Sequence, residues 1–238
     1  AGPTDPQLGL MVLRTPDRKP LAVLANLSLH YVGVSHNHNV VCADYFAAFG
    51  RALNRLAGAE FVCPIANGTF GDVNNLDFTR PCREALYGTH QIERVGNVVA
   101  AEAWRVWNGL REDDFQDDIA LGATLQRVNF PARYPSDEEM AAAKALYATG
   151  ENWDDAEWVY ARDLVLMEDL PRQWPVPIHS LRVGDLGIVG LPGEVFTEIG
   201  LDVKARSPLA QTMNIGIANG TVGYVATDQA LSEGSYET

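Results

Sequence analysis

The chain has 238 residues, of which 47% are hydrophobic, and its formal net charge is −13 at pH 7. Nucleic acids and anionic membrane surfaces are themselves negative, so this charge argues against both as partners. The mean hydropathy of −0.09 is ordinary for a soluble globular protein. No apolar run approaches the roughly 20 residues of a membrane-spanning helix.

The first third of the chain predicts a β-hairpin, a helix, a short strand and a loop. Two apolar runs, residues 8–13 and 21–29, flank the turn-like sequence RTPDRKP, which is typical of a hairpin. Apolar residues recur at helical spacing over residues 44–56. Residues 61–66 predict a short buried strand, and the segment 67–75, rich in glycine and asparagine, predicts a loop.

The middle of the chain predicts three helices and one strand. An amphipathic pattern over residues 91–108 predicts a long helix, and partial alternation over residues 118–130 predicts a strand. Residues 136–149 begin with SDEEM, which places acids in a first turn, and are followed by Gly150, as helices often are. A further helix is expected over residues 154–169, in an acidic insert.

The last part predicts a second hairpin, a helix and a strand. Residues 177–182 and 186–191 flank a Gly-Asp turn. A helix over residues 194–206 and a strand over residues 211–218 follow. Because helices and strands alternate and several strands form hairpins, the predicted fold is α/β, with a mixed β-sheet flanked by helices in a single domain.

Three residues that can bind a metal each follow an apolar run, namely His30, Glu194 and Tyr224. Side chains at the ends of buried strands could converge in the fold. An imidazole, a carboxylate and a phenolate around an open position suit Zn²⁺, which takes nitrogen and oxygen ligands and activates a bound water. If this site is real, the three side-chain heads lie within about 5 Å of one another.

Taken singly, each of the three has a structural interpretation as well. His30 ends an apolar strand and could be a hydrogen-bonded structural residue. Glu194 follows Pro-Gly where a strand leads into a helix, and the helix dipole alone favours a carboxylate there. Tyr224 follows a glycine and could be a packed strand aromatic.

Five stretches of the chain carry a family resemblance. In order, they are GPTDPQLGLMVLRTPDRKPLAVLANLSLHYVG, CADYFAAFGRAL, FVCPIANGTFGDVNNLDF, LRVGDLGIVGLPGEVFTEIGLDVKARSP and ANGTVGYVATDQALSEGSYE. Together they span nearly the whole chain, and they resemble the neutral (non-lysosomal) ceramidase family, in particular its bacterial members. In that family a zinc-bound water attacks the amide of ceramide.

The resemblance implies a role for particular residues of this chain. His30, Glu194 and Tyr224 match zinc ligands of the family, and Tyr236 matches a tyrosine that faces the scissile carbonyl. Tyr236 is therefore expected to donate a hydrogen bond to the developing oxyanion. Catalysis is expected to depend on Tyr236 and Glu194.

The loop over residues 67–75 is expected to shape the substrate site. Its glycines permit unusual backbone angles. We assign Asn67, Gly71 and Asp72 to substrate binding in this loop.

The chain reads GDVNN where animal ceramidases read GDVSPN, so Asn74 replaces a serine once argued to be the nucleophile. An amide nitrogen cannot serve as that nucleophile, so hydrolysis would depend on metal-activated water.

The family has one further zinc histidine, in a THTHSGP-like motif upstream of the point where this chain begins. Residues 1–238 are therefore expected to be a ceramidase-like catalytic domain that is N-terminally incomplete relative to the family. His36 and His38 lie in a polar segment. They are either part of a solvated loop or a replacement for the missing ligand.

Two functions are consistent with these patterns. The first is a hydrolase with one zinc ion, held more weakly and more exchangeably than in a full-length relative, that cleaves the amide of a small lipid-like, N-acyl-sphingosine-like substrate, or an ester. The second is a non-catalytic or incomplete ceramidase-like domain with a binding or structural role. The resemblance suggests a secreted or periplasmic protein, although the chain shows no signal-peptide pattern. The oligomeric state is left open.

Overall fold

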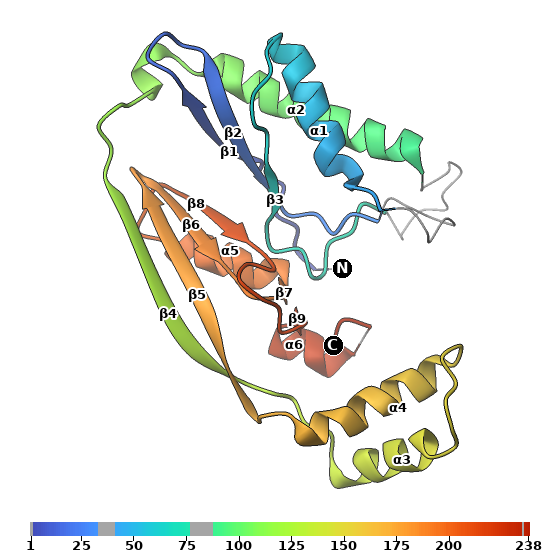
Figure 1. The fold of residues 1–238 in the computed structure, drawn as a ribbon. Helices are drawn as coiled ribbons and strands as arrows, with labels where there is room; N and C mark the ends of the chain where they lie inside the picture. The colour runs from blue at the N-terminus through green and yellow to red at the C-terminus, as the bar shows by residue number, and fades with distance from the viewer. Residues whose placement is uncertain (1, 33–40, 77–87, 235) are drawn as a thin grey trace. The chain divides into compact units, whose positions relative to one another are not determined.

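The computed structural model describes residues 2–32, 41–76, 88–234 and 236–238 (Figure 1). Contacts between residues group the chain into two compact units. The first unit comprises Ala1–Leu125 and Ile178–Thr238, and the second comprises Gln126–Pro177. The predicted α/β class with mixed sheets is confirmed, because parallel and antiparallel strand pairs occur together with helices.

The first sheet of the larger unit has the order β1-β2-β3. The strands β1 (Gly9–Arg14) and β2 (Pro20–Leu27) form the predicted antiparallel hairpin. Strand β3 (Ile65–Asn67) pairs with β2 in parallel and is shorter than predicted. The predicted strand began earlier, but Val62 makes only an isolated bridge with Ala22.

Two helices cover this sheet, as predicted. They are α1 (Asp44–Ala57) and α2 (Thr89–Gly109). Their apolar faces share one core with the sheet, which includes fully buried Val23, Phe49 and Leu53. Burial of such side chains stabilises a domain by roughly 1.5–3 kcal/mol each. Because β2 packs in this core, the core holds in place the strand end that precedes His30.

The second sheet has the order β4-β5-β6-β8. Its strands are β4 (Leu121–Pro131), β5 (Gln173–Val183), β6 (Leu186–Gly190) and β8 (Gln211–Ile215). The predicted hairpin is confirmed, since β5 pairs with β6 in antiparallel fashion around Gly184, whose φ of +60° favours glycine. Strand β8 pairs with β6 in parallel, so a connection must cross between them.

That connection carries β7 (Glu194–Val195) and the helix α5 (Thr197–Arg206). The predicted helix begins at residue 194, whereas α5 begins at Thr197, so the predicted start is wrong. The backbone amide of Glu194 donates to the carbonyl of Gly223 at 2.9 Å, and that of Phe196 donates to Val225 at 3.0 Å. These bonds keep the segment extended, so Glu194 is a strand residue and not a helix-start carboxylate.

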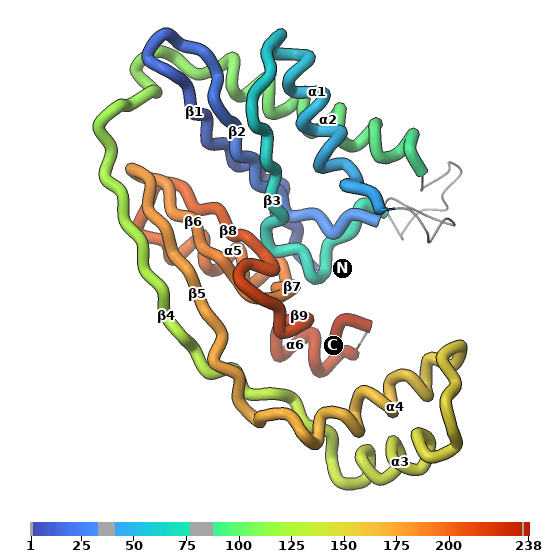
Figure 2. The backbone as a smooth tube through the Cα atoms, viewed as in Figure 1, coloured from blue at the N-terminus to red at the C-terminus, as the bar shows by residue number. Residues whose placement is uncertain are grey.

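The chain ends with a short strand and a short helix that the sequence did not predict as such. Strand β9 (Tyr224–Val225) lies beside β7 in parallel, and α6 (Asp228–Glu233) follows it (Figure 2). The side chain of Thr227 accepts a hydrogen bond from the amide of Ala230 at 3.2 Å and caps α6.

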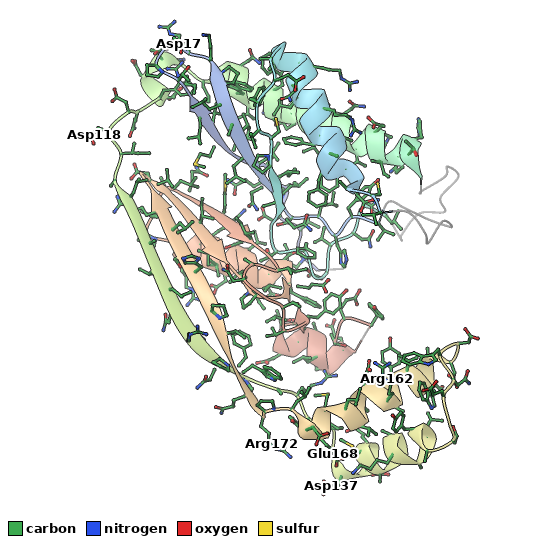
Figure 3. The ribbon with its side chains drawn as sticks, viewed as in Figure 1. Asp17, Asp118, Asp137, Arg162, Glu168 and Arg172 are labelled. Carbon is green, nitrogen blue, oxygen red and sulfur yellow. The ribbon has the colours of Figure 1, made fainter. Side chains whose placement is uncertain are left out.

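The second unit contains the two helices predicted in the acidic insert, α3 (Asp137–Tyr147) and α4 (Ala156–Leu166). They pack against each other around the buried Trp158. The predicted start of α3 is confirmed, because the side chains of Ser136 and Glu139 form a capping box. Figure 3 labels Asp137, Arg162 and Glu168 on this unit. Over the part of the chain described, no helix is both long and apolar enough to cross a bilayer.

Candidate functional site

The short β7–β9 ladder places two of the candidate side chains together. Glu194 and Tyr224 are direct register partners in this parallel pair. Side chains of parallel register partners point to the same face of the sheet. Gly223, just before Tyr224, has a φ of +80°, a backbone conformation that favours glycine.

His30 comes to the same place from the first sheet. It lies three residues beyond β2, and its backbone amide donates to the carbonyl of Val73 at 2.8 Å. Its Nδ1 is 3.7 Å from Oε2 of Glu194, and the two side chains are 35% and 21% exposed. The ring centroids of His30 and Tyr224 are 6.5 Å apart. The structure therefore brings the three side chains together in one partly exposed cluster.

The donor set of this cluster fits Zn²⁺. Two ligand atoms that share a tetrahedral zinc, each at about 2.1 Å, stand roughly 3.4 Å apart. The 3.7 Å between His30 and Glu194 is close to that separation. Within the described ranges, no group of three or more His, Cys, Asp and Glu side chains could hold a metal. A three-ligand site here therefore needs the phenol of Tyr224.

The phenol of Tyr224 is held in its protonated form in the metal-free protein. Burial, then the negative charge of Glu194 and a hydrogen bond to that carboxylate, together raise the pKa of Tyr224 to about 12. Glu194 thus accepts a hydrogen bond from the phenol. A cation bound between the two oxygens is what would favour the phenolate.

Tyr236 lies next to Tyr224. The two ring centroids are 6.1 Å apart in an edge-to-face arrangement, and Tyr236 is 76% exposed. An exposed hydroxyl beside the cluster is accessible to a substrate. Its role as an oxyanion donor stays a prediction.

The loop after β3 contacts β7 and α5 closely. The amide of Gly71 donates to the carbonyl of Val195 at 3.0 Å, and a Cβ at position 71 would clash with the carbonyl oxygen of Glu194. Oδ1 of Asp72 accepts from the amide of Thr197 at 2.7 Å and from its hydroxyl at 2.8 Å. Both loop residues therefore support the backbone that carries Glu194.

Asn67, the last residue of β3, is also hydrogen-bonded to a distant part of the backbone. Its carbonyl accepts from the amide of Gly216 at 3.1 Å, and its Oδ1 is buried without a hydrogen-bond partner among the described residues. Substrate binding by Asn67, Gly71 and Asp72 stays a prediction.

Asn74 makes an isolated bridge with His30, and its Oδ1 accepts from the amide of Leu76 at 3.2 Å. His36 and His38, the candidate replacements for a further ligand, lie outside the described residues.

Sequence reasoning missed two residues that the structure places at the cluster. Phe70, 2% exposed, meets the ring of His30 edge-on with 5.2 Å between centroids. Thr197 is fully buried and binds Asp72. An aromatic residue directly before Gly71 was a signal for the first. Nothing in the sequence joins Thr197 to a residue 125 positions away.

No family model and no curated protein matches the chain. Solved structures do match, two ceramidases among them. The neutral ceramidase from Pseudomonas aeruginosa superposes with a TM-score of 0.72 and 15% identity, over 98% of this chain and 43% of that chain. A ceramidase complexed with C2 superposes with a TM-score of 0.68 and 14% identity, over 98% and 44%. The chain therefore has a ceramidase-like fold, and it spans less than half the length of either protein.

Proposed function

We propose that this chain is a zinc-dependent hydrolase of the neutral ceramidase type, cleaving the amide of an N-acyl-sphingosine-like lipid or a related ester. One observation carries the proposal. On a ceramidase-like fold, Nδ1 of His30 lies 3.7 Å from Oε2 of Glu194, whose strand partner is Tyr224.

In this proposal His30, Glu194 and Tyr224 hold one Zn²⁺. The ion, when bound, supplies a water of lowered pKa and polarises the substrate carbonyl. Glu194 contributes the negative charge that a divalent cation requires, and it takes the phenolic hydrogen bond when the cation is absent. His30 contributes a neutral nitrogen, with its backbone fixed by Val73.

Tyr236 acts on the substrate itself. Its phenol is exposed, and its ring packs against that of Tyr224. In the proposed reaction the hydroxyl donates a hydrogen bond to the carbonyl oxygen as negative charge develops there. A single donor of this kind contributes about 3–4 kcal/mol to transition-state stabilisation.

A second candidate function is a ceramidase-like domain without catalysis. It is favoured by the small number of strong metal donors, because only one imidazole and one carboxylate meet within the described ranges. The third donor is a phenol whose pKa stands at about 12. In that case the chain binds a lipid-like ligand, or supports a longer protein, and holds no zinc.

Metal content and hydrolysis separate the two functions. The purified chain is analysed for bound zinc after dialysis against a low zinc concentration, and it is assayed with an N-acyl-sphingosine and with a nitrophenyl ester. We expect one zinc per chain, with both zinc and hydrolysis lost in His30→Ala and Glu194→Gln. The exposed residues His90 and Glu198 provide matched controls, as His90→Ala and Glu198→Gln. A wild-type chain that hydrolyses neither substrate and binds no zinc supports the second function.

A further inference from the structure

We propose that Asp72 and Thr197 are positioning residues that set the separation between His30 and Glu194. Their hydrogen bonds connect the loop after β3 to the start of α5. The same loop is hydrogen-bonded to the backbone of His30. This inference rests on the proposed function, because it concerns the same candidate zinc ligands.

The first half of the connection runs from the loop to the segment that carries Glu194. Oδ1 of Asp72 accepts two hydrogen bonds from Thr197, at 2.7 Å from the amide and 2.8 Å from the hydroxyl. Thr197 is the first residue of α5 and is fully buried. A carboxylate that accepts a backbone amide at a helix start makes a short charge-assisted bond, and the helix dipole favours it.

The second half runs from the loop to His30. The carbonyl of Val73, the residue after Asp72, accepts the amide of His30 at 2.8 Å. The side chain of Asn75 both accepts from the amide of Val32 at 2.9 Å and donates to its carbonyl at 3.3 Å. The backbone on either side of Tyr31 is thus bound to this loop.

Consecutive loop residues therefore contact both sides of the candidate site. Phe70 packs on the ring of His30, Gly71 binds the carbonyl of Val195, and Asp72 binds Thr197. The loop acts as a spacer between the strand end with His30 and the β7–α5 segment. Without the hydrogen bonds between Asp72 and Thr197, the loop and His30 can move together away from Glu194. The distance of 3.7 Å between Nδ1 of His30 and Oε2 of Glu194 is then no longer held fixed.

The chemistry of the pair permits selective substitution. Asp72 is exposed, so its removal leaves no buried charge. Thr197→Val keeps the side-chain shape and removes only the hydroxyl, whereas Thr197→Ser keeps the hydroxyl. Residues outside the ligand set that orient the ligands typically contribute about 10- to 100-fold to metal affinity.

The test measures zinc affinity of the metal-free full chain by competition with a chromophoric chelator. We expect Asp72→Ala and Thr197→Val each to weaken zinc binding by about 10- to 100-fold. The double variant should bind zinc no more weakly than Asp72→Ala alone, because Thr197→Val removes only one of the two hydrogen bonds that Asp72 accepts. Thr197→Ser should bind as the wild type does. Asp202→Ala removes another exposed carboxylate, on α5, and should change nothing.

A second measurement keeps the inference separate from the proposed function. The imidazole signals of His30 are recorded by NMR in the zinc-free protein, with Glu194→Gln as the reference for a lost His30–Glu194 contact. Asp72→Ala and Thr197→Val should shift these signals as Glu194→Gln does. If the wild type and His30→Ala both fail to bind zinc, the proposed function fails, and this NMR comparison alone decides the inference. Unchanged His30 signals, or wild-type zinc affinity in both variants, would overturn it.

Discussion

Glu194 and Tyr224 are direct partners in a parallel ladder of only two residues per strand, although helix α5 and strand β8 separate them in the sequence. The pairing holds a carboxylate and a phenol on one face, and the phenol donates to the carboxylate in the metal-free protein. A cation that binds both oxygens must replace that shared proton. The ladder therefore links the phenol directly to the metal chemistry proposed for the site.

The first prediction concerns this phenol. Tyr224→Phe removes one of three proposed donors and leaves the ring that packs against Tyr236. Removing a residue that only orients a ligand costs about tenfold or more in metal affinity. Removing a ligand itself should therefore weaken zinc binding by at least about tenfold. Chelator competition on the metal-free protein measures the change. The exposed Tyr160 gives a matched control, because Tyr160→Phe removes a phenol far from any proposed ligand in the sequence. Equal zinc affinity in Tyr224→Phe and the wild type would remove Tyr224 from the ligand set.

The second prediction concerns the close approach of Gly71 to β7. In Gly71→Ala the added methyl group would clash with the carbonyl of Glu194 and lie 3.0 Å from the ring of Phe196. Forced displacements of this kind cost about 1–3 kcal/mol. We expect a lower midpoint in urea denaturation together with weaker zinc binding, because Glu194 moves with its backbone.

Gly109 is the control for that change. No heavy atom lies within 4 Å of a Cβ built at this last residue of α2, so Gly109→Ala should leave stability and zinc binding nearly unchanged. Gly71→Ala with wild-type stability and zinc affinity would mean that β7 can shift without moving Glu194.

The elements with a clear period could be predicted from the sequence. The β1–β2 hairpin and the helices α1 and α2 follow from apolar spacing, and α3 begins where its Ser136 cap predicts. The start of α5 could not be predicted, because β7 is fixed by a tertiary partner, β9, and a strand of two residues has no period. A local pattern could only assign Glu194 to the following helix.

The candidate site shows the same limit. His30, Glu194 and Tyr224 were selected through a family resemblance, and periodicity alone would have left each as a structural residue. The sequence offered no means of finding that Asp72 binds Thr197, because the contact spans 125 positions and neither residue lies in a repeating pattern. Such a contact is seen only in the three-dimensional structure, where the loop after β3 lies beside the start of α5.

The third prediction concerns the nucleophile. Asn74 offers only an amide, and its Oδ1 is already used by the amide of Leu76. Asn74→Ala should leave hydrolysis largely intact and lower the free energy of unfolding by about 1 kcal/mol, the net contribution of one neutral hydrogen bond. Glu194→Ala, in contrast, should abolish both hydrolysis and zinc binding. Activity assays run beside zinc analysis decide the point. If Asn74→Ala removes activity while zinc stays bound, the metal-water mechanism loses its main support.

The fourth prediction concerns alkaline stability and depends on the core, not on the site. Tyr45 is fully buried, and its hydroxyl has no hydrogen-bond partner in the part of the chain described. Burial, assisted by the nearby Tyr31, raises the pKa of Tyr45 well above its usual value near 10. The unfolded chain therefore loses this proton at lower pH than the folded chain does. Stability is fully present below about pH 10 and falls as the pH rises further.

Tyr45→Phe tests this assignment. Because the hydroxyl is buried without a partner, its removal should leave stability at pH 7 unchanged or raise it by about 1 kcal/mol. Above pH 10 the variant should lose stability less steeply than the wild type, since one of the groups that ionise first in the unfolded state is gone. Urea denaturation at pH 7, 9, 10 and 11 measures both effects. Tyr160→Phe, at an exposed tyrosine, should leave the slope unchanged. A Tyr45→Phe chain that is less stable at pH 7, with the wild-type slope above pH 10, would mean that the hydroxyl has a partner in solution.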